Sequence, residues 1–279
     1  MNVIKSLAVY AAALMAWCAL PASAATVDGM KIQSSSVGTG PTIVFVHGWT
    51  CDSSSWTGQV PAFSKDHRVI TLDLPGHGES GSPKDGKLSM DLFARAVEAV
   101  RAEAGAGAER IVLVGHSMGA PVIRQYAHLY PQHVAGLVAV DGPLDLRAFG
   151  ELPAGFPPPL TGPEGRAARE GMIRSMFIAE TPASLQDHIL KMMLAAPEAT
   201  AVGAMNAMFD PAIRWTDVID APALTVYAGT ANVPDAATTK QLYPHHDATQ
   251  LAGTGHFLMM EKPEEFNRLL AGFLDKIDF

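Results

Sequence analysis

The sequence predicts an α/β fold built around one mostly parallel sheet. Short, unbroken apolar segments recur along the 279 residues, and segments with an apolar helical face lie between most of them. Unbroken runs of valine, isoleucine and phenylalanine are typical of strands buried on both faces. One long stretch without a strand-like segment interrupts the alternation. Alternating strands and helices indicate parallel pairing through crossover connections, and the interruption indicates an insertion.

The predicted strands are short and mostly apolar. The segment GMKIQSSSVGTGPTIVFVHG predicts a strand, a Gly-Pro turn and a second strand that is apolar from Ile43 to Val46. Further strands are predicted at VITLDL from Val69, IVLVG from Ile111, GLVAV from Gly136, ALTVYAG from Ala223 and ATQLAG from Ala248.

Three segments between the strands have the pattern of helices. They are MDLFARAVEAVRAEAG, the stretch from Met118 to Tyr130, and PEEFNRLLAGFLDKI near the C-terminus. In the last segment the apolar residues follow the i, i+3, i+4, i+7 spacing of one helix face, and Pro263 suits the first turn.

Residues 143–215 contain no strand-like run. A proline-rich entry, GFPPPLTGPEG, precedes several helical stretches rich in methionine. An all-helical insertion after the sixth strand suits a cap over the carboxyl edge of the sheet, where open α/β sheets bind ligands. The methionines either shape an adaptable apolar pocket or simply pack. The predicted core is then formed by residues 25–142 and 216–279.

The first 24 residues have the pattern of a secretory signal peptide. Lys5 precedes an apolar run of about 14 residues, shorter than a membrane span, and Ala22-Ser23-Ala24 suits cleavage. We therefore expect an exported, periplasmic or secreted protein without a stable membrane anchor. Cys18 lies inside the signal, in a context that does not suit lipid attachment. Cys51 is then the single cysteine of the mature chain, cannot form an internal disulfide, and is expected to be a packed or surface thiol.

Composition argues against one class of partner. The chain is 48% hydrophobic, with a formal net charge of -8. Nucleic-acid binding needs concentrated lysine and arginine, which this chain lacks. No cluster has metal-ligand spacing and no glycine loop suits a phosphate, so we expect no metal and no cofactor. Oligomeric state is left open.

The segment LVGHSMGAP carries the strongest chemical signal. It places Gly-x-Ser-x-Gly, with Ser117 at its centre, directly after a buried strand and directly before a helix. A sharp strand-to-helix turn exposes the serine oxygen, and the helix N-terminus favours negative charge beside it. We expect Ser117 to be a nucleophile.

Two further loops would serve that nucleophile. His47-Gly48-Trp49 ends the first buried strand, where the backbone N–H of Trp49 and that of Met118 are positioned to form an oxyanion hole. His256 lies in a glycine-flanked loop before the final helix, from which its ring can reach over the sheet edge as general base.

In this order the motifs HGW, DLPGHGES, GHSMG and GHF…EKPEEFNRLL resemble those of α/β-hydrolase fold enzymes, from about residue 40 to the end. The resemblance implies a Ser-His-acid hydrolase of the α/β-hydrolase fold with a helical cap. It also implies structural roles for Asp73, His77 and Ser80 in the DLPGHGES loop. A serine nucleophile counts against the epoxide-hydrolase and haloalkane-dehalogenase branches.

The triad acid is not where most members of the family carry it. In them an aspartate follows the strand equivalent to ALTVYAG, but this chain has Asn232 there. Asparagine at this place leaves the imidazole in the wrong tautomer. Two carboxylates remain: Asp141 ends the strand GLVAV, as in exported relatives, and Asp235 stands three residues beyond Asn232. Asp141 is preferred, Asp235 is the alternative, and a weak or water-bridged arrangement without a direct acid is the third possibility.

The function predicted from these residues is hydrolysis of a small carboxylic ester with an apolar part, through an acyl-enzyme. The same apparatus could cleave a lactone, an amide or a carbon–carbon bond. An alternative from another class is a ligand-binding protein on a retired hydrolase scaffold, with Asn232 as a mark of decay. Cap side chains decide substrate and acyl length, and the sequence alone does not arrange them in space.

Overall fold

The computed structural model describes residues 24–107, 109–144, 156–210, 213, 215–277 and 279. The predicted signal peptide therefore lies outside the described residues except for Ala24. None of the helices in the described ranges is both long and apolar enough to cross a membrane.

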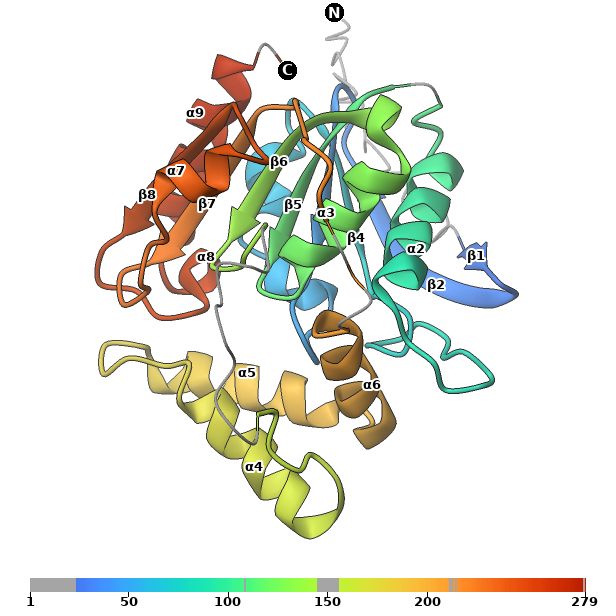
Figure 1. The fold of residues 1–279 in the computed structure, drawn as a ribbon, viewed down its shortest axis with the longest axis vertical. Coiled ribbons are helices and arrows are strands. Elements are labelled where there is room, and N and C mark those ends of the chain that lie inside the picture. The colour runs from blue at the N-terminus through green and yellow to red at the C-terminus, as the bar shows by residue number, and fades with distance from the viewer. Residues whose placement is uncertain (1–23, 108, 145–155, 211–212, 214, 278) are drawn as a thin grey trace, which may run out of the picture.

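A mixed, mostly parallel sheet of eight strands forms the centre of the molecule (Figure 1). Its order is β1-β2-β4-β3-β5-β6-β7-β8, antiparallel from β1 to β4 and parallel from β4 to β8. The strands are β1 Ala24–Val27, β2 Met30–Val37, β3 Thr42–Val46, β4 Arg68–Leu72, β5 Ile111–His116, β6 Val134–Val140, β7 Ala223–Ala228 and β8 His246–Leu251. All strands predicted from the sequence are present, and β3 and β5 are buried along their whole length.

Strand β1 was not predicted. Its four residues, AATV, adjoin the apolar N-terminus, and their pattern is too short and too small-sided to indicate a strand. The strand pairs with β2 across a tight turn, with Ala25 opposite Ile32. Tertiary pairing rather than local propensity therefore defines this edge of the sheet.

Helices flank the sheet or lie beyond its carboxyl edge. They are α1 Val60–Phe63, α2 Met90–Glu103, α3 Gly119–Leu129, α4 Gly162–Arg174, α5 Ala183–Ala195, α6 Glu198–Met208, α7 Ala236–Lys240, α8 Leu258–Glu261 and α9 Pro263–Lys276, with 3-10 turns η1 Ser53–Trp56 and η2 Pro131–His133. The Ser89 hydroxyl caps α2 by accepting a hydrogen bond from the Leu92 N–H. Helix α9 begins at Pro263 and buries its predicted apolar face, part of which covers Gly136 of β6.

The helices α4, α5 and α6 follow β6 and precede β7, and form a separate layer beyond the carboxyl ends of the parallel strands (Figure 1). Hydrogen bonds tie this layer to the core: the Trp49 indole N–H donates to the Ala201 carbonyl at 2.8 Å, and the Thr200 hydroxyl donates to the Gly76 carbonyl at 2.7 Å. Met192 and Met205 are buried, and the Met192 sulfur contacts the hydroxyls of η1. These methionines pack.

Candidate active site

Ser117 stands at the turn between β5 and α3 with a φ of 52°. A left-handed conformation is uncommon for a residue with a side chain and is typical of a strained functional turn. The backbone on both sides leaves no room for larger residues. A Cβ on Gly115 would overlap the carbonyl of Gly119, and one on Gly119 would overlap the carbonyl of Val46. The spacing of the motif is thus a steric requirement of the turn.

The loop after β3 passes directly against Ser117. A Cβ on Gly48 would come 2.9 Å from His116 Nδ1 and 3.2 Å from the Ser117 Cβ, so a larger residue would force the His116 ring or the loop to shift. Among the described residues, none accepts a hydrogen bond from the backbone N–H of Trp49 or of Met118. Both predicted oxyanion donors therefore retain their hydrogen-bonding capacity beside the serine.

His47 holds this loop in place. The Leu74 N–H donates to its Nε2 at 2.9 Å, so the proton lies on Nδ1, which donates to the Gly48 carbonyl at 2.8 Å. Burial lowers the pKa of His47 and keeps the ring neutral, as this pattern requires. Its role here is to shape the loop.

Asp141 and His256 meet at the same sheet edge. The His256 Nδ1–H donates to Asp141 Oδ2 at 2.6 Å, and the Ala228 N–H donates to Asp141 Oδ1 at 2.8 Å. Burial favours the neutral acid, but the hydrogen bond from His256, its charge and the Ala228 N–H outweigh burial and hold the pKa of Asp141 below its ordinary value. The acid is therefore ionised and orients the imidazole.

Asp235 caps a helix and does not contact His256. Its carboxylate accepts a hydrogen bond from the Ala237 N–H at 3.3 Å as the N-cap of α7, and its side chain is exposed, as is that of Asn232. The structure brings Asp141, and not Asp235, to His256.

Several contacts of the His256 loop were missed by the sequence reasoning. The His116 Nε2–H donates to the His256 carbonyl at 2.9 Å, and the His256 N–H donates to the carbonyl of Met176, which follows α4. Burial lowers the pKa of His116 to about 3, so this ring stays neutral. The Gly255 N–H donates to Glu261 Oε2 at 2.7 Å. In the sequence, the only sign of these close contacts was the glycine that precedes His256, Gly255.

The remaining singled-out residues are structural. Asp73 accepts hydrogen bonds from the N–H groups of Ser53 and Glu79, and the Ser80 hydroxyl donates to its carbonyl at 2.6 Å. Cys51 is buried, and burial raises the pKa of its thiol well above the ordinary value. The hydrogen bonds of Asp73 and Ser80 and the burial of Cys51 are those of structural residues.

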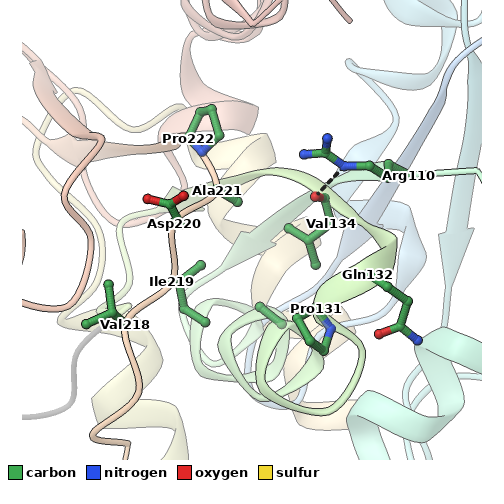
Figure 2. Close-up of a pocket in the computed structure, with 10 residues that line it drawn as sticks. Arg110, Pro131, Gln132, Val134, Val218, Ile219, Asp220, Ala221 and Pro222 are labelled. Carbon is green, nitrogen blue, oxygen red and sulfur yellow. Dashed lines mark hydrogen bonds between the residues drawn. The ribbon is translucent and has the colours of Figure 1, made fainter.

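A cavity of about 480 Å³ opens at the other end of the strands (Figure 2). Arg110 precedes β5, Val134 begins β6 and Pro222 precedes β7, so the cavity lies at the amino ends of these strands. In Figure 2 the Arg110 Nε–H donates to the Val134 carbonyl at 2.9 Å. Ser117 and Asp141 follow the carboxyl ends of β5 and β6, so this cavity is not part of the candidate site.

Comparison with known proteins agrees with this geometry. Residues 41–193 match the family model of the alpha/beta hydrolase fold. The dihydrolipoyllysine-residue acetyltransferase component of the acetoin cleaving system of Cupriavidus necator is 30% identical over 88% of this chain and 67% of its own length. The pimeloyl-[acyl-carrier protein] methyl ester esterase of Aeromonas hydrophila is 32% identical over 48% of this chain and 50% of its own length.

The chain thus spans about two thirds of the first relative and half of the second. Among solved structures, Est816, described as an N-acyl homoserine lactone degrading enzyme, is 28% identical with a TM-score of 0.73. The match covers 89% of this chain and 99% of that one. The matched residues include the Ser117 turn and make up more than half of the chain, and the mostly parallel sheet with flanking helices is that of the α/β hydrolase fold. The chain belongs to the α/β hydrolase fold family.

Proposed function

We propose that this chain is an exported serine hydrolase of carboxylic esters, with Ser117, His256 and Asp141 as its triad. The observation that carries the proposal is the 2.6 Å hydrogen bond from the His256 Nδ1–H to the ionised Asp141. This bond leaves Nε2 of the ring as the free proton acceptor, at the sheet edge to which the strained Ser117 turn belongs.

The proposed mechanism has two steps. His256 Nε2 takes the Ser117 proton as the oxygen attacks the ester carbonyl, and Asp141 stabilises the imidazolium. The N–H groups of Trp49 and Met118 hold the oxyanion, each worth roughly 3 to 4 kcal/mol of barrier. The imidazolium then protonates the leaving alcohol. Water, activated by the same ring, hydrolyses the acyl-enzyme and regenerates the serine.

The proposed substrate is a small ester with an apolar part, held under the helical cap of residues 143–215. A relative named as a methyl ester esterase supports ester chemistry. A lactone is the second candidate, because Est816 is described as degrading N-acyl homoserine lactones and matches nearly the whole chain. A lactone is a cyclic ester, so attack by Ser117 would break the ring C–O bond and give an acyl-enzyme whose acyl group keeps the leaving oxygen, protonated by His256, as a hydroxyl.

The test uses the mature protein, from Ala25 onward. Wild type should react with a fluorophosphonate probe and hydrolyse a short-chain chromogenic ester, and Ser117→Ala should do neither. Comparison of an N-acyl homoserine lactone with its linear methyl ester ranks the two candidate substrates. A wild type that is neither labelled nor active, while it binds some ligand, would support the retired-scaffold alternative.

Export is proposed from the N-terminal pattern alone. When the full chain is expressed in a bacterial host, the extracytoplasmic protein should begin at Ala25 by N-terminal sequencing. An intact N-terminus on protein confined to the cytoplasm would contradict the proposed localisation.

A further inference from the structure

The loop that carries His256 contacts the cap as well as the core. The cap side of this contact is the segment 176–181, which links α4 to α5. We propose that Glu261 is a positioning residue for the hydrolysis proposed above: its carboxylate joins the His256 loop to segment 176–181, so that the seating of the cap sets the place of the base.

Glu261 bridges two segments that are distant in sequence, through a backbone N–H of one and a side-chain hydroxyl of the other. Its Oε2 accepts a hydrogen bond from the Gly255 N–H at 2.7 Å, one residue before His256. Its Oε1 accepts a hydrogen bond from the Thr181 hydroxyl at 3.1 Å. Hydrogen bonds to a carboxylate are about twice as strong as those between neutral groups, so the bridge is well suited to hold the loop.

Thr181 completes the connection on the cap side. Its side chain is buried, and its Oγ1 accepts a hydrogen bond from the Ile178 N–H at 3.1 Å while its proton goes to Glu261. The Thr181 hydroxyl therefore orders the turn of segment 176–181 and ties that turn to the carboxylate at once.

Segment 176–181 also touches the base directly. The His256 N–H donates to the Met176 carbonyl at 3.1 Å. A Cβ on Gly255 would come 2.7 Å from the same carbonyl and 3.1 Å from Glu261 Oε1. The loop and the segment are therefore in close contact on either side of the peptide that leads into His256, and a shift of one displaces the other.

The position of this peptide matters for the chemistry. The His256 ring is held by one side-chain bond to Asp141, and its backbone is held by His116 and Met176. Loss of the Glu261 bridge would leave the triad residues present but the ring less well placed for the proposed attack by Ser117. A misplacement of about 1 Å can cost on the order of 10²-fold in rate.

The experiment compares Glu261→Ala, Glu261→Gln and Thr181→Val with the control Glu264→Ala. The control removes a nearby exposed glutamate from the first turn of α9. Active sites are counted by fluorophosphonate titration, kcat is expressed per labelled site with a short-chain ester, and thermal unfolding is followed in parallel.

We expect Glu261→Ala to lower kcat per labelled site by about 10- to 100-fold, with KM changed by less than about threefold. Glutamine keeps an acceptor for the Gly255 N–H and a polar group toward Thr181, so Glu261→Gln should retain kcat within about threefold. Thr181→Val should lose about three- to tenfold, and combining it with Glu261→Ala should add little, because both break one connection.

A role in folding alone would lower stability and the number of labelled sites but leave kcat per site unchanged. Wild-type kcat per site in Glu261→Ala would therefore overturn the proposal. If that variant does not fold, the near-isosteric Thr181→Val decides, and its wild-type kcat would do the same. Failure of the proposed function would instead show in the wild type, as absence of labelling and turnover.

Discussion

Replacement of Asp141 by asparagine tests the triad most directly. The pKa of Asp141 lies below its ordinary value, because the hydrogen bond and charge of His256 and the Ala228 N–H together outweigh burial. The substitution therefore exchanges a carboxylate for a neutral amide of the same shape. Asparagine has one acceptor oxygen where aspartate has two, and both aspartate oxygens are used.

The magnitude follows from these two bonds. If the amide oxygen faces the Ala228 N–H, the amide NH₂ faces His256 Nδ1 and stabilises the tautomer whose Nε2 is protonated and cannot act as base. Turning the oxygen toward His256 leaves the Ala228 N–H without an acceptor, at about 1 to 3 kcal/mol. Loss of a charged partner for the imidazolium adds about 1.5 to 3 kcal/mol. Together these are roughly 2.5 to 6 kcal/mol, or about 10²- to 10⁴-fold in kcat.

The assay is ester turnover per fluorophosphonate-labelled site, with Asp235→Asn as the matched control. Asparagine caps helices about as well as aspartate, so the control should keep α7 and retain kcat within about twofold. A loss below about tenfold in Asp141→Asn, or a large loss confined to Asp235→Asn, would refute the assignment of the acid.

Three further predictions concern packing and pH. Gly119→Ala should lower the free energy of unfolding by about 1 to 3 kcal/mol, measured by urea denaturation, because its Cβ would overlap a β3 carbonyl; an unchanged midpoint would contradict the steric reading of the motif. Trp49→Phe should cost about 0.5 to 1.5 kcal/mol of stability, because the Ala201 carbonyl of α6 loses the hydrogen bond from the indole, yet it should retain kcat within a fewfold, since the backbone N–H remains; a collapse of kcat would mean that the indole itself is needed. Burial lowers the pKa of His77 and of His116 to about 3. Below about pH 6.5 the unfolded chain therefore binds more protons than the folded chain, and the free energy of unfolding decreases as the pH is lowered. We expect a decrease of about 2 kcal/mol per histidine between about pH 7 and about pH 5. Urea denaturation at both pH values should show a smaller fall in His77→Asn, and an equal fall would contradict the prediction.

Local pattern was enough to predict most of the fold. The apolar runs around Val44 and Val112 must be buried on both faces, because they offer no polar side. Helix α9 follows from its periodicity and from Pro263. The Ser117 turn could be predicted because its two glycines are part of a short motif. Gly115 is required by a contact within the motif, with Gly119, whereas Gly119 is required by its close approach to β3. Strand β1 was not readable, since only its partner makes it a strand.

Sequence alone placed Ser117 and His256 at one sheet edge, because parallel strands bring their carboxyl ends together. It left two carboxylates open, Asp141 and Asp235, since both follow strands that end at that edge. Only the tertiary structure separates them. Asp141 leaves β6 with a φ of 43° and its carboxylate meets the His256 ring, while Asp235 caps α7 and points to solvent. The choice depends on side-chain direction and loop path, which spacing along a chain does not encode.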